Sequence, residues 1–301
     1  MSKVITIVQA RMSSSRLPGK VMRTILGQPI LKLQLERMSF SKCCGQIVVA
    51  TSLNPSDDII EKFCLENQID VLVTAPINKY NIQSEEFKFP GHTDYLDKEL
   101  EGNALMLMVQ DNLRVGLLTD HIPVNDVAEH LTEKLIIQKI ETIKQTLIQD
   151  FGINKPKIAV LALNPHAGDN GVIGKEDDEL VKPVIKKMFE KGTLVFGPFA
   201  ADGFFGSSQY QKYDAVVATY HDQGLIPFKT LSFGGGVNYT AGLNKIRTSP
   251  DHGTAYEIAG KGIADYNSFK EAVYTAIDIY NSRYQYQEMS KNPMKTKEKQ
   301  L

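Results

Sequence analysis

Short apolar runs alternate along this chain with longer segments whose apolar residues recur at helical spacing. Three runs in the first quarter are typical of short buried strands: residues 4–8, 46–51 and 70–74. Residues 30–38 have helical spacing. Ser56 is a helix-capping residue, and Asp57 and Asp58 after it carry the charge that the first turn of a helix favours.

The same alternation continues to the last quarter of the chain. Three segments predict longer helices: residues 132–150, 176–191 and 268–283. Gly152 and Gly192 stand just after the first two, where helices commonly end. This order of elements predicts an α/β fold, in which a layered, mostly parallel sheet carries helices on both faces.

Composition excludes several classes of protein. The 301 residues include 34 Lys and Arg and 35 Asp and Glu, so a net charge of -1 predicts neither a nucleic-acid partner nor a membrane surface. No apolar run approaches the roughly 20 residues of a membrane-spanning helix. The three cysteines, Cys43, Cys44 and Cys64, have no C-x-x-C spacing, which is typical of reduced thiols in a cytoplasmic protein.

Three of the six histidines each follow a strand-like run: His121 after residues 113–119, His166 after 157–163 and His221 after 214–220. Ligands of open α/β sheets bind outside the carboxyl ends of strands. A single histidine at such a place is more often a loop residue with a local hydrogen bond. Three in equivalent positions favour an open catalytic site for a divalent metal (Zn, Mg or Co).

A basic loop, residues 10–20, follows the first strand and carries Arg11, Arg16 and Lys20. Such a loop either holds the phosphates of a nucleotide or is simply solvated. Residues 1 to about 70 resemble the N-terminal part of the sugar cytidylyltransferases of the spore coat polysaccharide and CMP-sugar synthetase type, through the segment 9–20. The later acidic residues with which that family holds its metal are absent.

From residue 71 to about 284 the chain resembles a different family, the 4-hydroxythreonine-4-phosphate dehydrogenases of pyridoxal phosphate biosynthesis. Six segments carry the resemblance, in family order: residues 73–79, 89–93, 163–168, 220–224, 236–238 and 246–253. The resemblance implies an isocitrate-dehydrogenase-like fold, NAD as cofactor and a homodimer that shares its active sites. It also assigns roles to individual residues, with His121, His166 and His221 as metal ligands and His92, Thr93, Lys229, Asn238 and Arg247 as substrate contacts.

The implied reaction is the NAD-dependent oxidation of 4-phosphohydroxy-L-threonine, followed by decarboxylation to 3-amino-2-oxopropyl phosphate. Lys229 and Arg247 would supply positive charge to the anionic groups of this small substrate, and Lys229 is also a catalytic candidate. Asp202 and Asp222 would orient metal ligands or relay a proton, or belong to solvated loops. His252, in an Asp-His-Gly turn, is a candidate cofactor contact, and His130 is structural.

The two resemblances divide the chain into residues 1–70, a truncated nucleotidyltransferase-like β-α-β-α segment, residues 71–284, the dehydrogenase portion, and residues 285–301, a polar tail. The Gly-Asp-Pro-Ala-Gly-Ile-Gly-Pro-Glu type of segment with which the dehydrogenase family opens does not occur. Two alternatives to the dehydrogenase therefore stay open: a CTP-dependent sugar-acid cytidylyltransferase, and an inactive hybrid that only binds ligands.

Overall fold

The computed structural model describes residues 5–12, 17, 19–40, 46–51, 57, 59–60, 62–63, 71–74, 76, 92–258 and 261–292. Its strands are β1 (Ile5–Ala10), β2 (Thr24–Ile25), β3 (Gln28–Pro29), β4 (Gln46–Thr51), β5 (Val71–Thr74), β6 (Gly102–Gln110), β7 (Leu113–Leu117), β8 (Ile158–Leu161), β9 (Val195–Phe199), β10 (Ala215–Ala218), β11 (Val237–Leu243) and β12 (Ile246–Pro250). Its α-helices are α1 (Ile30–Ser39), α3 (His92–Glu99), α4 (Val127–His130), α5 (Glu133–Gln149), α6 (Lys182–Glu190), α7 (Ala201–Gly206), α8 (His221–Ser232) and α9 (Asn267–Ser290).

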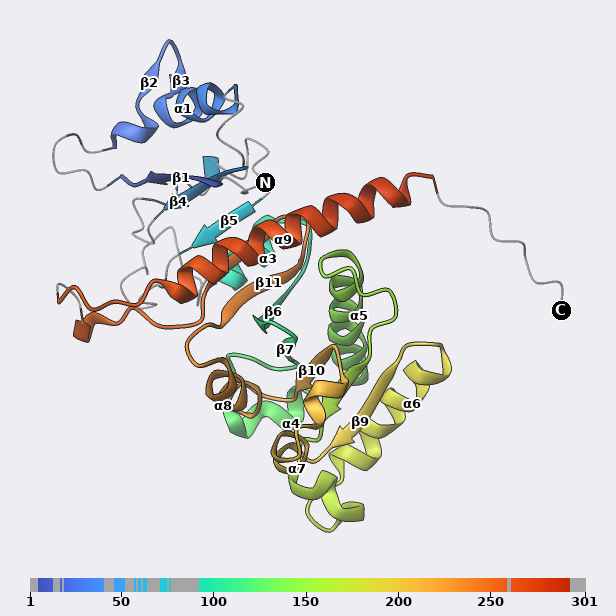
Figure 1. Cartoon of the computed structure of the whole chain (residues 1–301). Coiled ribbons are helices and arrows are strands. Elements are labelled where there is room, and N and C mark those ends of the chain that lie inside the picture. The colour runs from blue at the N-terminus through green and yellow to red at the C-terminus, as the bar shows by residue number, and fades with distance from the viewer. Residues whose placement is uncertain are drawn as a thin grey trace.

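In the described part of the chain, ten strands form one sheet in the order β1-β4-β5-β12-β11-β6-β7-β10-β8-β9 (Figure 1). The strands at each end of the sheet pair in parallel, whereas β12, β11, β6 and β7 pair antiparallel in its centre. The predicted α/β fold with a mostly parallel sheet is therefore confirmed. Three antiparallel pairings in succession also mean that the two parallel blocks run in opposite directions, which the sequence pattern did not predict.

Helices cover both faces of the sheet, as predicted. On one face Ile136, Ile140 and Ile143 of α5 pack in a core that also includes residues of α6 and α9. On the other face Leu225 and Phe228 of α8 pack with residues of α7. Alternate residues of the strands point into the two cores, so the sheet is buried on both sides.

The N-terminal segment belongs to the same sheet. Strands β1 and β4 extend it through β5, and Val8 and Val49 pack against Leu31 of α1 and against Ile60. The N-terminal segment thus supplies two strands to the same sheet as the rest of the chain. Most of the helix predicted after Ser56 lies outside the described residues.

Helix ends follow the predicted signals at α5 and differ at α9. Thr132 caps α5 by accepting a hydrogen bond from the backbone N–H of Leu135, and Gly152 follows the helix with φ of 69°. Helix α9 continues to Ser290, so the helix end predicted at residue 283 was wrong. Within the described part of the chain, no helix is both long and apolar enough to cross a membrane.

A buried charged cluster connects α9, the end of α5 and strand β11. Arg283 of α9 donates to both carboxylate oxygens of Asp150, through Nε at 2.7 Å and Nη2 at 3.0 Å, and the Tyr239 hydroxyl of β11 donates to Asp150 at 2.6 Å. All three side chains are buried. Arg283 also donates through Nη1 to the carbonyl oxygens of Leu243 and Asn244. Because all three side chains are buried, these hydrogen bonds replace those that water would make.

Candidate functional site

The three strands that precede the candidate metal histidines are neighbours. Strands β7, β10 and β8 pair in parallel, so their carboxyl ends meet at one edge of the sheet. The pairing of β7 with β10 continues beyond the strands, because the Thr119 hydroxyl donates to the Thr219 carbonyl oxygen at 2.7 Å. The residues just before His121 and His221 are therefore held side by side.

His121 and His221 form a pair at this edge. Their ring centroids lie 5.9 Å apart, with the rings tilted by 43°. Nδ1 of His221 lies 2.6 Å from Oδ1 of Asp222, and Nδ1 of His121 lies 3.9 Å from Oδ2 of Asp120. A carboxylate at Nδ1 favours the proton there and leaves the lone pair on Nε2, the form in which histidine binds a metal. Asp222 thus lies beside Nδ1 of His221, and its orienting role stays a prediction.

His166 does not join this pair. It is exposed in the turn Pro165–Gly171, where residues 166–170 all have positive φ, with His166 at 53°. This left-handed run turns the chain at once after Pro165, so the histidine does not simply continue the line of β8. Among the residues that the structure describes, no three His, Cys, Asp or Glu lie together in a way that could hold a metal ion.

The base of the His166 turn is fixed by Asp177, which sequence analysis missed. This buried carboxylate accepts hydrogen bonds from the backbone N–H groups of Leu163 at 2.7 Å and Asn164 at 2.9 Å. The side chain of Asn164 also donates to Glu176, and hydrogen bonds to the backbone and to Asn164 lower the pKa of the Glu176 carboxyl. The only sequence signal was an acidic residue at the start of a predicted helix.

Arg247 is buried in the centre of the sheet. Its Nη2 and Nε donate to the Thr74 hydroxyl at 2.7 and 3.0 Å, and Nη1 donates to that of Thr240 at 3.3 Å. Arg247 pairs with Thr240 in the register of β11 and β12, while the hydroxyl of the next residue, Thr248, bonds to α9. Because side chains alternate along a strand, Arg247 points to the sheet face opposite α9.

Asn238 lies on the same face, two residues before Thr240. Its Oδ1 is buried and has no hydrogen-bond partner among the described residues. A buried acceptor without a donor is uncommon in a folded protein, and it marks a place where a ligand can donate. The structure therefore brings together two of the predicted substrate contacts, Arg247 and Asn238.

Lys229 and His252 lie away from the strand ends that carry the histidine pair. Lys229 is exposed on α8, and its charge opposes the effect of burial, which raises the pKa of the Asp251 carboxyl. His252 follows Asp251 directly and is exposed, with Nδ1 2.8 Å from the Gly253 carbonyl oxygen. Since α8 rises about 1.5 Å per residue, Lys229 is about 12 Å along the helix from His221. Within one chain, His121 and His221 (the histidine group) are thus separate from Lys229 and His252 (the Lys229 group).

The remaining predicted residues are less defined. His92 begins α3, but its side chain is outside the described part, and Thr93 beside it is half-buried. Asp202 is exposed in the first turn of α7, which follows β9 at the edge of the sheet. His130 is exposed on α4, with Nδ1 2.8 Å from the Asp126 carbonyl oxygen, consistent with the structural role expected of it.

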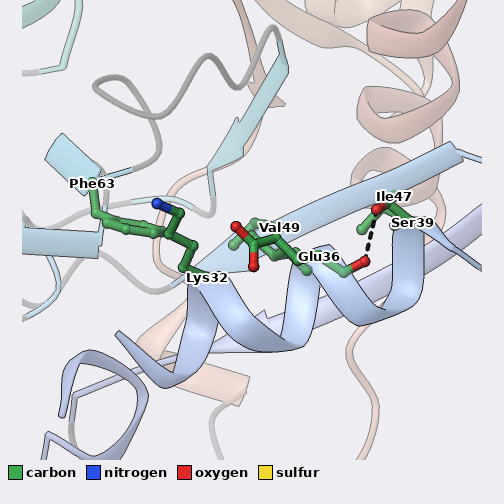
Figure 2. A pocket seen from close by; sticks show the side chains of 7 residues that line it. Lys32, Glu36, Ser39, Ile47, Val49 and Phe63 are labelled. Carbon is green, nitrogen blue, oxygen red and sulfur yellow. Dashed lines mark hydrogen bonds between the residues drawn. The ribbon is translucent and has the colours of Figure 1, made fainter. Parts of the chain in front are cut away.

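One cavity lies beside the histidine pair, and another lies in the N-terminal part of the chain. One of about 430 Å³ opens beside the histidine pair and is lined by Thr119, Asp120 and His130, among others. The other, of about 300 Å³, lies between α1 and β4, and Lys32, Glu36 and Phe63 are among the residues that line it (Figure 2). None of the predicted site residues lines this second cavity.

Comparison with known proteins decides the family. The family model described as pyridoxal phosphate biosynthetic protein PdxA matches residues 29–276. The chain belongs to the PdxA family. All the candidate metal, substrate and cofactor residues, from His92 to His252, lie within this match.

Relatives of the PdxA family agree with this assignment. The 4-hydroxythreonine-4-phosphate dehydrogenase of Bacteroides thetaiotaomicron is 53% identical over 232 residues, which are 76% of this chain and 64% of that protein. The crystal structure of the Klebsiella pneumoniae enzyme of that name matches with a TM-score of 0.63 and 38% identity, covering 72% of this chain and 66% of that one. The chain therefore spans slightly less than two thirds of the length of these relatives.

The PdxA match also bears on the N-terminal segment. It begins at residue 29, inside the region that resembles a cytidylyltransferase. A 4-hydroxythreonine-4-phosphate dehydrogenase structure from Burkholderia phymatum, 28% identical with a TM-score of 0.62, covers 91% of this chain and 98% of its own. The comparisons do not support the cytidylyltransferase resemblance. In the structure Arg11 and Lys20 are exposed, and Arg16 lies outside the described residues.

Proposed function

We propose that this chain is an oxidoreductase that oxidises 4-phosphohydroxy-L-threonine with NAD and releases 3-amino-2-oxopropyl phosphate after decarboxylation. The observation that carries this proposal is the PdxA match over residues 29–276, which includes every candidate site residue. The names of the relatives with 53% and 38% identity support the same reaction.

The chemistry of the predicted substrate contacts suits such a substrate. Arg247 presents a guanidinium fixed by Thr74 and Thr240, which fits a planar carboxylate or a phosphate. Lys229 adds a second positive charge that is exposed and able to reach a phosphate. Oδ1 of Asn238, which has no partner among the described residues, would accept from the ammonium or hydroxyl group of the amino acid. His252, on the Lys229 side, is our candidate for a contact with NAD.

A divalent metal is the second part of the proposal. The two imidazoles of His121 and His221, with a carboxylate near each Nδ1, suit zinc or cobalt better than magnesium. His166 is proposed as the third ligand, although its turn keeps it apart from the pair here. When bound, such a metal lowers the pKa of a coordinated hydroxyl group.

A homodimer with shared active sites is the third part. The histidine group and the Lys229 group lie about 12 Å apart along α8, farther than a small amino-acid phosphate bridges comfortably. A second copy would allow the histidine group of one chain to face the Lys229 group of its partner. Ile226 and Phe233, which expose 63% and 91% of their surface at α8, provide apolar area for such a contact.

Removal of any one metal-type histidine is expected to abolish binding of Co²⁺ or Zn²⁺, since each would supply one of only three protein ligands. The measurement is isothermal titration of His121→Ala, His166→Ala and His221→Ala with each ion, with circular dichroism to show that the fold persists. His130→Ala is the matched control and should bind like the unchanged chain. Full metal stoichiometry in His166→Ala would contradict the ligand assignment.

Removal of the basic N-terminal loop charges is expected to leave the oxidation unchanged. Arg11 and Lys20 are exposed and remote in sequence from the candidate residues, so the double variant Arg11→Ala/Lys20→Ala should form NADH from 4-phosphohydroxy-L-threonine at nearly the original rate. A fluorescence assay for NADH tests the proposed reaction and the variant together. Release of pyrophosphate from CTP and a sugar acid, lost in the double variant, would instead establish the cytidylyltransferase.

A further inference from the structure

The side chain of Gln223 connects the ends of two strands. Gln223 lies in the first turn of α8, and its Oε1 accepts from the backbone N–H of Thr219 at 2.8 Å and from the Thr219 hydroxyl at 2.9 Å. Its Nε2 donates to the carbonyl oxygen of Ala162 at 2.6 Å. Thr219 follows β10 and Ala162 follows β8, so one amide group bonds to both.

This amide extends the pairing of β8 and β10 beyond their backbone ladder. The register of the two strands ends at the pair Val217 and Val160. Beyond it, Ala162 donates its own N–H to Phe199 on the other side, at 2.8 Å. Its carbonyl oxygen accepts from Nε2 of Gln223. The side chain therefore links the two strands just beyond their last paired residues.

Capping of α8 does not explain both contacts. A glutamine at the third position of a helix often accepts from a backbone N–H just before the helix, as in a capping box. The bonds to Thr219 fit that role, but the bond to Ala162 lies on another strand, 61 residues earlier, and satisfies no group of α8. It fixes the distance between the two strand ends.

We propose that Gln223 is a positioning residue that sets the His166 turn against His221. Ala162 is followed within four residues by His166, and Thr219 within two by His221, so a shift between the strand ends moves one histidine relative to the other. The link from Thr119 to Thr219 carries the same alignment on toward His121. The importance of this alignment for catalysis rests on the proposed function.

Two variants separate the halves of the amide. Gln223→Glu keeps an acceptor for Thr219 but sets an oxygen against the Ala162 carbonyl oxygen, two acceptors that repel. Gln223→Met keeps the length of the side chain and removes every hydrogen bond. Gln145→Met is the control, because Gln145 is exposed on α5 and bonds only weakly, at 3.4 Å to Gln149 and 3.5 Å to Tyr286.

The first readout is the NMR spectrum of the chain with labelled histidines. We expect both Gln223 variants to shift the ring resonances of His166 and His221, while those of His130 and His252 stay in place. A role limited to stability would lower the melting temperature and leave the spectrum of the folded state unchanged. Unshifted His166 and His221 rings in a folded Gln223→Met variant would overturn the proposal.

The second readout is Co²⁺ binding, followed by its visible absorbance. Loss of a residue that orients ligands typically costs about 10- to 100-fold in metal affinity, so Gln223→Met should bind Co²⁺ that much more weakly than Gln145→Met. Equal affinities of the two variants would also count against the proposal. If the unchanged chain binds no Co²⁺ and forms no NADH, the proposed function fails, and the NMR result alone decides the role of Gln223.

Discussion

Replacement of Arg247 by lysine is expected to lower kcat/KM for 4-phosphohydroxy-L-threonine by about a hundredfold or more, as loss of a charge-assisted, oriented contact does. Lysine keeps the charge but has a single ammonium group. It cannot hold the hydroxyl groups of Thr74 and Thr240 together and still present a planar fork to the substrate. Lys229→Ala should cost a similar factor through loss of charge.

The control for Arg247 is Arg114, a half-buried arginine on β7. Arg114 lies 4.6 Å from the centre of the Phe151 ring, and burial lowers its pKa despite the nearby Asp214 carboxylate. Arg114→Lys should reduce stability but leave kcat/KM per folded molecule close to its original value. Initial rates of NADH formation, corrected for the folded fraction, make the comparison. A loss in Arg114→Lys equal to that in Arg247→Lys would mean that Arg247 acts through the fold and not on the substrate.

Replacement of Asp150 by asparagine is expected to lower the free energy of unfolding by about 3–5 kcal/mol, because it leaves a buried arginine charge without its counter-ion. Burial alone would lower the pKa of Arg283, but its hydrogen bonds and charge interactions with Asp150 and Tyr239 raise it instead. Burial raises the pKa of the Tyr239 hydroxyl well above its ordinary value, and the Asp150 carboxylate adds to the rise. Both partners therefore depend on the carboxylate.

Urea unfolding measures this loss. Asp178→Asn is the control, since Asp178 pairs with Lys182 at 3.4 Å on the surface, and an exposed pair contributes only about 0–1 kcal/mol. The double variant Asp150→Leu/Arg283→Met should regain much of the stability, because it removes both charges together. If Asp150→Asn costs no more than Asp178→Asn, the cluster is not a determinant of stability.

The sequence by itself determined most of the elements. The strand at 46–51 and the helix between Thr132 and Gly152 have the predicted bounds, because periodicity, a cap and a left-handed glycine are local signals. The motifs of the dehydrogenase resemblance also predicted the family, and the PdxA match confirms that family. That three histidines follow neighbouring strands was a consequence of the α/β alternation, and it holds for β7, β10 and β8.

Only the tertiary structure decided the direction of the strands and the positions of the site residues. An apolar run has the same pattern in either strand direction, so the sequence did not reveal that β12 runs opposite to β7 and β10. This direction places His252, which follows β12, away from the histidine pair. The contacts of Gln223 with Ala162, and of Arg247 with Thr74, join residues 61 and 173 positions apart. Such bonds leave no periodic trace in a sequence, because they form only when the strands that bear them have packed into one sheet.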